Sequence, residues 1–169
     1  MSFSIRLAGE QDFLGLAAIE IEARTRFSDN DMSAELRGYC TPQHELRASH
    51  REGLLWVAEV PGRGVVGFLA AALFDQGIHV LQMSVRPAEG RMGIGTSLLA
   101  CVLQEAHDRK LAHVSLTTFA HIPWNAPAYS KCGFITLDPH QLTPALRECL
   151  ANENEAGLSD RVAMRKSAA

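Results

Sequence analysis

The feature that most constrains this chain is a glycine-rich turn between a strand-like segment and a helix-like one. Residues 78–85 (I-H-V-L-Q-M-S-V) predict a strand, and residues 90–95 read G-R-M-G-I-G. From residue 94 onward, apolar side chains recur at helical spacing. Residues 90–93 include no Ser, Thr, Asp or Asn to cap the first N–H groups of this helix. Those groups are suited to binding a phosphate, although a plain strand–helix turn explains the glycines equally well.

A β-rich centre flanked by helices is predicted for the rest of the chain. Strands are expected at residues 3–7, 54–60, 65–74, 78–85, 114–118, 134–137 and 162–166. Helices are expected at residues 10–26, 94–109, 124–132 and 142–152, with polar turns and short helical pieces over residues 27–50. There is no internal repeat and no linker, so we expect one mixed α/β (α+β) domain over residues 1–169.

The length and charge of the chain narrow the class of ligand. Its 169 residues suit a single domain, and 16 Lys and Arg against 19 Asp and Glu give a net charge of −3. A domain that binds duplex nucleic acid normally has a basic excess, so nucleic acid is not expected as a partner. An anionic ligand must therefore be held by a local group of donors, because the field of the whole protein does not attract it.

The sequence predicts a cytoplasmic protein with no membrane partner. No apolar run approaches the roughly 20 residues that a membrane-spanning helix needs, and the first residues do not resemble a signal peptide. The cysteines lie far apart without C-x-x-C spacing, at positions Cys40, Cys101, Cys132 and Cys149. This spacing indicates reduced, mostly buried thiols and no metal site.

Two nucleotide-binding classes fit the glycine turn poorly. A P-loop is excluded because no G-K-[ST] follows the glycines. A dinucleotide-binding fold is disfavoured because the turn follows a run of hairpin strands rather than a chain-initial βαβ unit. An unrelated nucleotide-binding domain would be stabilised by NAD or ATP.

Three segments together resemble a known family. Residues 85–99 (V-R-P-A-E-G-R-M-G-I-G-T-S-L-L) resemble the acetyl-CoA pyrophosphate loop of GNAT-type N-acetyltransferases. Residues 125–134 (N-A-P-A-Y-S-K-C-G-F) resemble the second signature of that family, and residues 162–166 resemble its last strand. The order of elements also fits, so the resemblance covers nearly the whole chain. The run P-W-N-A-P-x-Y-x-x-x-G-F is similar to that of a bacterial subgroup of mostly generic acetyltransferases.

The resemblance implies a GNAT-like central mixed, mostly antiparallel sheet flanked by helices, and an enzyme that uses acetyl-CoA. It implies that acetyl-CoA is bound by Met83, Val85, Arg91, Met92, Gly93, Ile94, Gly95, Thr96, Asn125 and Tyr129. The resemblance also implies that the backbone N–H at Met83 is the oxyanion donor and that the phenol of Tyr129 is the acid that protonates the departing thiolate. A homodimer is an expectation at the level of the family.

Two positions depart from the family pattern. Gly90 stands where the family has Arg or Gln, and the flanking Arg91 is a substitute for the missing charge. Gln82 stands where many relatives have a Glu, so the commonest general base of the family is absent. The alternatives for this role are Glu20, Glu22, His79, His121 and a chain of water molecules.

The expected reaction transfers an acetyl group to a primary amine of a small-molecule or amino-acid-like acceptor, by direct attack in a ternary complex. The acceptor side is expected to come from the first helix and residues 27–50. There, Asp29, Asp31 and Glu35 can attract a cationic amine, although such a cluster is usually a solvated face. Acetylation of a protein N-terminus or lysine is the alternative acceptor, and a non-catalytic acyl-CoA-binding module is the alternative outside the enzyme class.

Overall fold

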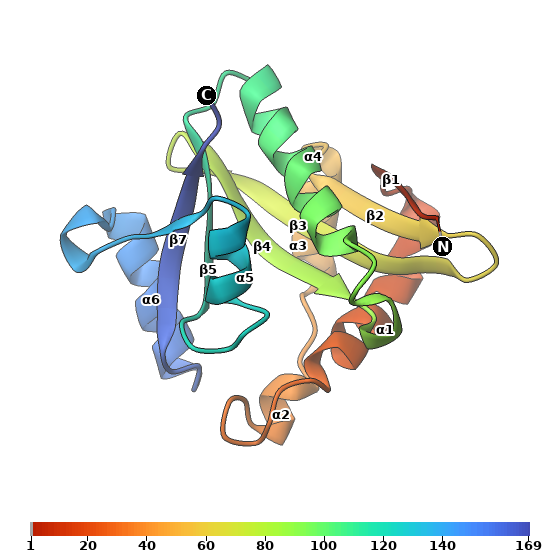
Figure 1. The fold of residues 1–169 in the computed structure, drawn as a ribbon, viewed down its shortest axis with the longest axis horizontal. Coiled ribbons are helices and arrows are strands. Elements are labelled where there is room, and N and C mark those ends of the chain that lie inside the picture. Colours follow the sequence, from red (N-terminus) through yellow and green to blue (C-terminus); the bar gives the residue numbers. More distant parts are fainter. Residues whose placement is uncertain (1) are drawn as a thin grey trace. The chain divides into compact units, whose positions relative to one another are not determined.

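The computed structural model describes residues 2–169, whose strands form one seven-stranded sheet (Figure 1). The strands are β1 (Ser4–Leu7), β2 (Leu55–Val60), β3 (Gly64–Phe74), β4 (Gly77–Val85), β5 (His113–Phe119), β6 (Ile135–Thr136) and β7 (Arg161–Ser167). The helices are η1 (Glu10–Asp12), α1 (Phe13–Arg24), α2 (Ala34–Arg37), α3 (Gln43–Arg51), η2 (Pro87–Glu89), α4 (Ile94–Asp108), α5 (Ala126–Lys131), η3 (Pro139–Gln141) and α6 (Pro144–Glu155). The strand order is β1-β2-β3-β4-β5-β7-β6. The expected mixed, mostly antiparallel sheet flanked by helices is therefore confirmed.

The described chain divides into two compact units. The first unit comprises residues 2–72 and 80–102, and the second comprises residues 73–79 and 103–169. Both β3 and β4, and also the long helix α4, contribute residues to each unit.

In the first unit, helices pack on both faces of the antiparallel strands. β1 pairs along its length with β2, and β2 pairs with β3. Val57 of β2 and Phe68 of β3 are buried together with Leu16 of α1 and Leu46 of α3. Figure 1 shows α4 crossing in front of these strands while α3 lies behind them. The start of α4 is therefore held against the face of the sheet opposite to α1 and α3.

In the second unit, β4 begins parallel to β5, with Ile78 opposite Val114. β7 pairs antiparallel with β5 along its length and with the short β6 on its other side. Helix α6 packs against β7 by burying Leu146 with Ala163. This arrangement places the start of β4, the whole of β5 and the following loop in one compact body.

The start of β4 has room for glycine only. A Cβ at Gly77 would overlap the backbone carbonyl oxygen of His113 and come within 2.7 Å of its ring. Because the carbonyl belongs to the backbone, it has little freedom to move aside. The close approach of β4 to β5 at this point therefore requires a residue without a side chain.

The structure differs from the sequence prediction in two places. Residues 43–51 form the nine-residue helix α3, where the polar pattern predicted only turns and short helical pieces. Its N-cap is Pro42, which makes no side-chain cap, so the buried contact of Leu46 rather than a local signal stabilises the helix. The four cysteines are free thiols, but each is half-buried rather than buried.

Candidate active site

The start of α4 presents backbone donors that have no acceptor. Gly93 has a φ of +81°, in the left-handed region, and its carbonyl accepts the first bond of the helix from Ser97 N at 3.0 Å. Among residues 2–169, no group accepts a hydrogen bond from the N–H of Ile94, Gly95 or Thr96. A glycine at the cap position has no side chain to bind them. These donors and the positive end of the helix dipole therefore form an anion-binding arrangement.

Arg91 is a basic side chain of this turn that an anion can reach. Arg86 precedes the turn, but it forms an ion pair with Glu22 of α1. Arg91 lies within the turn, is exposed, and forms no ion pair with any described residue. The expected substitution of Arg91 for the charge missing at Gly90 is therefore compatible with the geometry.

The two loop glycines have different roles. Gly93 supplies the left-handed backbone, and its missing side chain faces open space. Gly95 instead lies over β4, since a Cβ there would be in ordinary contact with Met83 Cε at 3.5 Å. The start of α4 thus packs directly on the strand that carries Met83 and Val85. The first unit brings together all of the predicted cofactor residues from Met83 to Thr96.

The predicted residues Asn125 and Tyr129 lie together in the second unit. Asn125 is 9% exposed at the N-cap of α5, and its Oδ1 accepts a hydrogen bond of 2.7 Å from Thr118 Oγ1 of β5. Its backbone carbonyl accepts from Tyr129 N at 3.0 Å. Because Oδ1 is occupied, the side-chain NH₂ group of Asn125 is the part left for a ligand. No sequence signal links Thr118 to Asn125, so Thr118 is a supporting residue that the sequence analysis missed.

The phenol of Tyr129 is held in its protonated form. Its ring packs edge-on to that of Phe134, with the centroids 6.1 Å apart. Burial raises the pKa of Tyr129 to about 12, although the positive charge of Arg161 opposes the shift. The phenol oxygen has no hydrogen-bonding partner within the second unit. A protonated, unpartnered phenol is what a proton donor requires.

The carboxylates considered as general bases already have partners. Glu20 is 1% exposed, pairs with Arg24 at 2.6 Å and accepts hydrogen bonds from the backbone N–H and hydroxyl of Thr41. Glu22 is bound to Arg86. Each would have to give up an ion pair to accept a proton from an amine.

Gln82 and the two histidines considered as general bases differ in their surroundings. Gln82 donates a hydrogen bond from Nε2 to Ser84 Oγ at 2.9 Å. His79 is 6% exposed, its Nδ1 lies 2.8 Å from Ser115 Oγ, and burial lowers its pKa to about 4. A histidine with this pKa is a weak base. His121 is exposed.

The acidic residues expected on the acceptor side are mostly tied within their own segment. Asp29 pairs with Arg37, and Asp31 accepts hydrogen bonds from the hydroxyl and N–H of Ser28. Glu35 is exposed in the first turn of α2. These contacts favour a local structural role for Asp29 and Asp31.

Residues 2–169 contain neither a membrane-spanning helix nor a metal-binding group of side chains. Among the helices of residues 2–169, none is both long and apolar enough to cross a membrane. The same residues hold no group of three His, Cys, Asp or Glu side chains placed to bind a metal ion.

The fold is shared with solved acetyltransferase structures at low identity. The N-acetylglutamate synthase of Neisseria gonorrhoeae, solved with coenzyme A and N-acetyl-glutamate, matches 100% of this chain with 17% identity and a TM-score of 0.74. The chain spans only 36% of that synthase. Ard1 from Thermoplasma volcanium matches 99% of this chain and 98% of its own, with 19% identity and a TM-score of 0.69. The PaiA N-acetyltransferase of Thermoplasma acidophilum, solved with coenzyme A, matches 99% of each chain with 16% identity and a TM-score of 0.67.

A sequence model of the acetyltransferase (GNAT) family matches residues 17–134. That range is more than half of the 169 residues and contains both the glycine loop and the Asn-Tyr segment. The chain belongs to the GNAT acetyltransferase family. This is a family of acetyltransferases that use acetyl-CoA, as the resemblance of the motifs implied.

Proposed function

We propose that this enzyme transfers the acetyl group to a primary amine of a small-molecule or amino-acid-like acceptor, by direct attack in a ternary complex. The observation that carries the proposal is the row of unbound N–H groups at Ile94, Gly95 and Thr96, behind the left-handed Gly93. The pyrophosphate of acetyl-CoA is an anion of the kind that such a helix start binds, and Arg91 adds a positive charge. The run P-W-N-A-P-x-Y-x-x-x-G-F supports the bacterial subgroup named above.

Different residues of the chain would carry out the separate parts of acetyl transfer. Acetyl-CoA supplies an acetyl group activated as a thioester. The backbone N–H at Met83 would donate to the carbonyl oxygen as negative charge develops there. Tyr129 would give its proton to the sulfur when the carbon–sulfur bond breaks, and the NH₂ group of Asn125 would donate to the cofactor. The attacking amine forms the new carbon–nitrogen bond and loses one proton to water, and the phenolate of Tyr129 takes a proton back from the solvent.

One structurally similar enzyme supports a small acceptor rather than a peptide. The structurally similar N-acetylglutamate synthase was solved with an acetylated amino acid, which supports an amino-acid-like acceptor here. Acetylation of a peptide N-terminus or lysine is the second candidate, because the family resemblance alone does not separate the two.

The test is a transfer assay with separate detection of both products. Purified protein is incubated with acetyl-CoA and a panel of amines, amino acids and peptides, and CoA and acetylated amine are measured by chromatography and mass spectrometry. We expect equal amounts of CoA and acetylated product with at least one small amine. Turnover of peptides only would replace the proposed acceptor with the second candidate, whereas CoA release without any amine would indicate thioester hydrolysis.

A thermal-shift comparison separates binding from transfer. A ligand that binds only the folded protein stabilises it by RT ln(1 + [L]/Kd). We expect CoA and acetyl-CoA to raise the melting temperature, and NAD and ATP to leave it unchanged. A shift with acetyl-CoA, combined with no transfer to any amine, would favour a non-catalytic acyl-CoA-binding module.

A further inference from the structure

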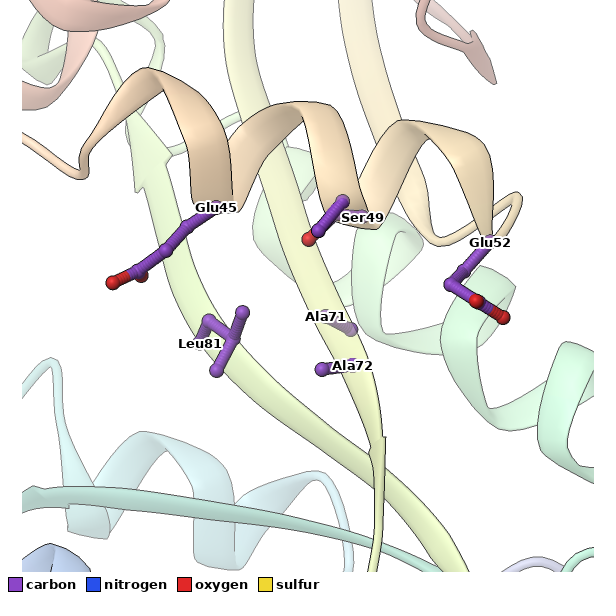
Figure 2. A pocket seen from close by; sticks show the side chains of 7 residues that line it. Glu45, Ser49, Glu52, Ala71, Ala72 and Leu81 are labelled. Carbon is purple, nitrogen blue, oxygen red and sulfur yellow. The ribbon is translucent and has the colours of Figure 1, made fainter.

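A cavity of about 350 Å³ lies between helix α3 and the strands β3 and β4, within the first unit. Its volume falls in the range of about 300–1,000 Å³ that is usual for small-ligand sites. Ala71 and Ala72 of β3 and Leu81 of β4 line it on the strand side. Figure 2 shows these apolar side chains facing α3 across the cavity. A ligand with an aliphatic part would therefore contact apolar surface on one side.

The helix side of the cavity is polar. Glu45, Ser49 and Glu52 stand at positions i, i+4 and i+7, which places them on one face of the helix. Figure 2 shows the two carboxylates toward opposite ends of the cavity, with Ser49 between them and its hydroxyl turned toward the strands. Glu45 forms no ion pair or side-chain hydrogen bond with any described residue. Glu45 and Ser49 are therefore the side chains that a ligand could bind, and Glu52 is a lining residue of the cavity.

Ser49 supplies the second, independent observation. It is 2% exposed, and its hydroxyl oxygen has no hydrogen-bond partner. A serine inside a helix ordinarily bonds the carbonyl one turn earlier, which the hydroxyl of Ser49 does not do. Burial of an unpartnered hydroxyl is unfavourable, so a buried hydroxyl turned into a cavity indicates a ligand that binds it.

We propose that this cavity binds an alkylammonium group. The carboxylate of Glu45 would pair with the ammonium group, and the hydroxyl oxygen of Ser49 would accept a hydrogen bond from one of its N–H groups. Ala72 and Leu81 would contact the alkyl chain. An anionic group is disfavoured because both charged residues of the lining are acidic. A group held there as an ammonium ion is not the attacking amine, because attack requires an unprotonated nitrogen. The proposal concerns binding only and does not depend on acetyl transfer.

The test uses n-butylammonium chloride and the full chain, without acetyl-CoA. The backbone amides of ¹⁵N-labelled protein are followed by NMR during the titration. We expect saturable shifts confined to residues 45–52, 71–72 and 81, and no such shifts with sodium butyrate or 1-butanol. The Glu45→Gln variant should weaken binding by about tenfold, because it removes the charge but keeps the shape. The exposed Glu148→Gln on α6 is the matched control and should bind as the wild type does.

Ser49→Ala separates a ligand role from a structural one. Because the hydroxyl has no partner in the folded protein, its removal should not lower the melting temperature of the free protein. It should nevertheless weaken butylammonium binding by roughly threefold. Equal shifts with 1-butanol, or binding that is unchanged in Glu45→Gln, would overturn the proposal, as would no saturable shift up to about 50 mM butylammonium.

An acetyl-transfer assay with the same probe then identifies the source of the ammonium group. If the bound group belongs to the acceptor, diamines should be acetylated with a KM that rises in Glu45→Gln, while the KM of simple amines is unchanged. If it belongs to an effector, butylammonium should alter the rate of acetylation of another amine, and Glu45→Gln should abolish that effect. Failure of all transfer would contradict the proposed function but would leave the NMR result as it stands.

Discussion

Gln82 donates a hydrogen bond from its side-chain amide to the hydroxyl of Ser84, two residues further along β4, at 2.9 Å. Residues two apart on a strand share a face, so the bond follows the strand rather than crossing it. The position at which the family resemblance predicts a carboxylate is therefore occupied by a hydrogen-bond donor to a neighbouring side chain. A reaction that uses no base at this position has to remove the proton of the amine by another route, through water or through another side chain.

Replacing Gln82 tests this directly. Gln82→Ala should change kcat by less than about threefold, since the amide transfers no proton. Gln82→Glu should increase kcat/KM several-fold at the acidic end of the pH profile, because Ser84 can donate to the new carboxylate and hold it in place. Steady-state kinetics from pH 6 to 9 measure both effects. A loss of about 100-fold in Gln82→Ala would instead assign Gln82 a catalytic role.

Tyr129→Phe removes only the phenol oxygen. We expect kcat to fall by about 100-fold, the lower end of general-acid contributions, with the Kd of acetyl-CoA unchanged within about twofold. Because the pKa of Tyr129 is raised to about 12, the phenol stays protonated through pH 6–10, and no descending limb of the profile in that range should depend on it. The other tyrosine, the exposed Tyr39, provides the control variant Tyr39→Phe, which should have wild-type kinetics.

Gly93→Ala and Gly62→Ala form a matched pair. Both glycines have a φ near +80°, and neither Cβ would meet another atom within 4 Å, so each substitution should cost about 1–2 kcal/mol of stability. Only Gly93 lies at the proposed pyrophosphate site. Calorimetry should therefore show a loss of acetyl-CoA affinity of about tenfold in Gly93→Ala and none in Gly62→Ala. Equal affinities in the two variants would contradict the site.

We expect the buried His79 to make the folded protein less stable in acid. Burial lowers its pKa from 6.5 to about 4, so between these values the unfolded chain binds a proton that the folded chain does not. Stability is therefore complete above pH 6.5 and falls as the pH is lowered toward 4, by about 3 kcal/mol from this residue. Urea unfolding at several pH values measures the slope.

His79→Gln serves as the comparison because a glutamine can still bond Ser115. Its stability should depend less on pH between 6.5 and 4 than that of the wild type. The exposed His140→Gln is the control and should keep the wild-type slope. A wild-type slope in His79→Gln would show that His79 does not remain neutral in the folded protein.

Local sequence patterns predict the positions of most strands and of the glycine loop. Alternating or continuous apolar runs place β2, β3, β4 and β5 to within one residue, because burial on a sheet imposes those patterns directly. The missing cap at residues 90–93 fits an anion site and a plain turn equally well, and the resemblance of residues 85–99 to the family loop favours the anion site. The missed helix α3 has a single large apolar side chain, Leu46, so its stability depends on packing that no local pattern shows.

The sequence does not show the surroundings of the candidate bases, because the residues that contact them lie far away along the chain. Glu20 is bound by Thr41, which lies 21 residues away, and His79 is bound by Ser115, which lies 36 residues away. Only the folded chain shows that the carboxylate of Glu20 already has partners and that the imidazole of His79 is buried. The sequence likewise does not show that the hydroxyl of Ser49 has no hydrogen-bond partner, because this depends on how the chain packs around it.

The close approach at Gly77 limits how this sequence can vary. The carbonyl of His113 occupies the space in which any side chain at position 77 would begin. In a library randomised at this codon and selected for soluble expression, only glycine should survive, although the turn glycine at position 62 should tolerate several replacements. Two glycines that look alike in the sequence thus differ in their tolerance, because one meets a facing backbone and the other meets solvent.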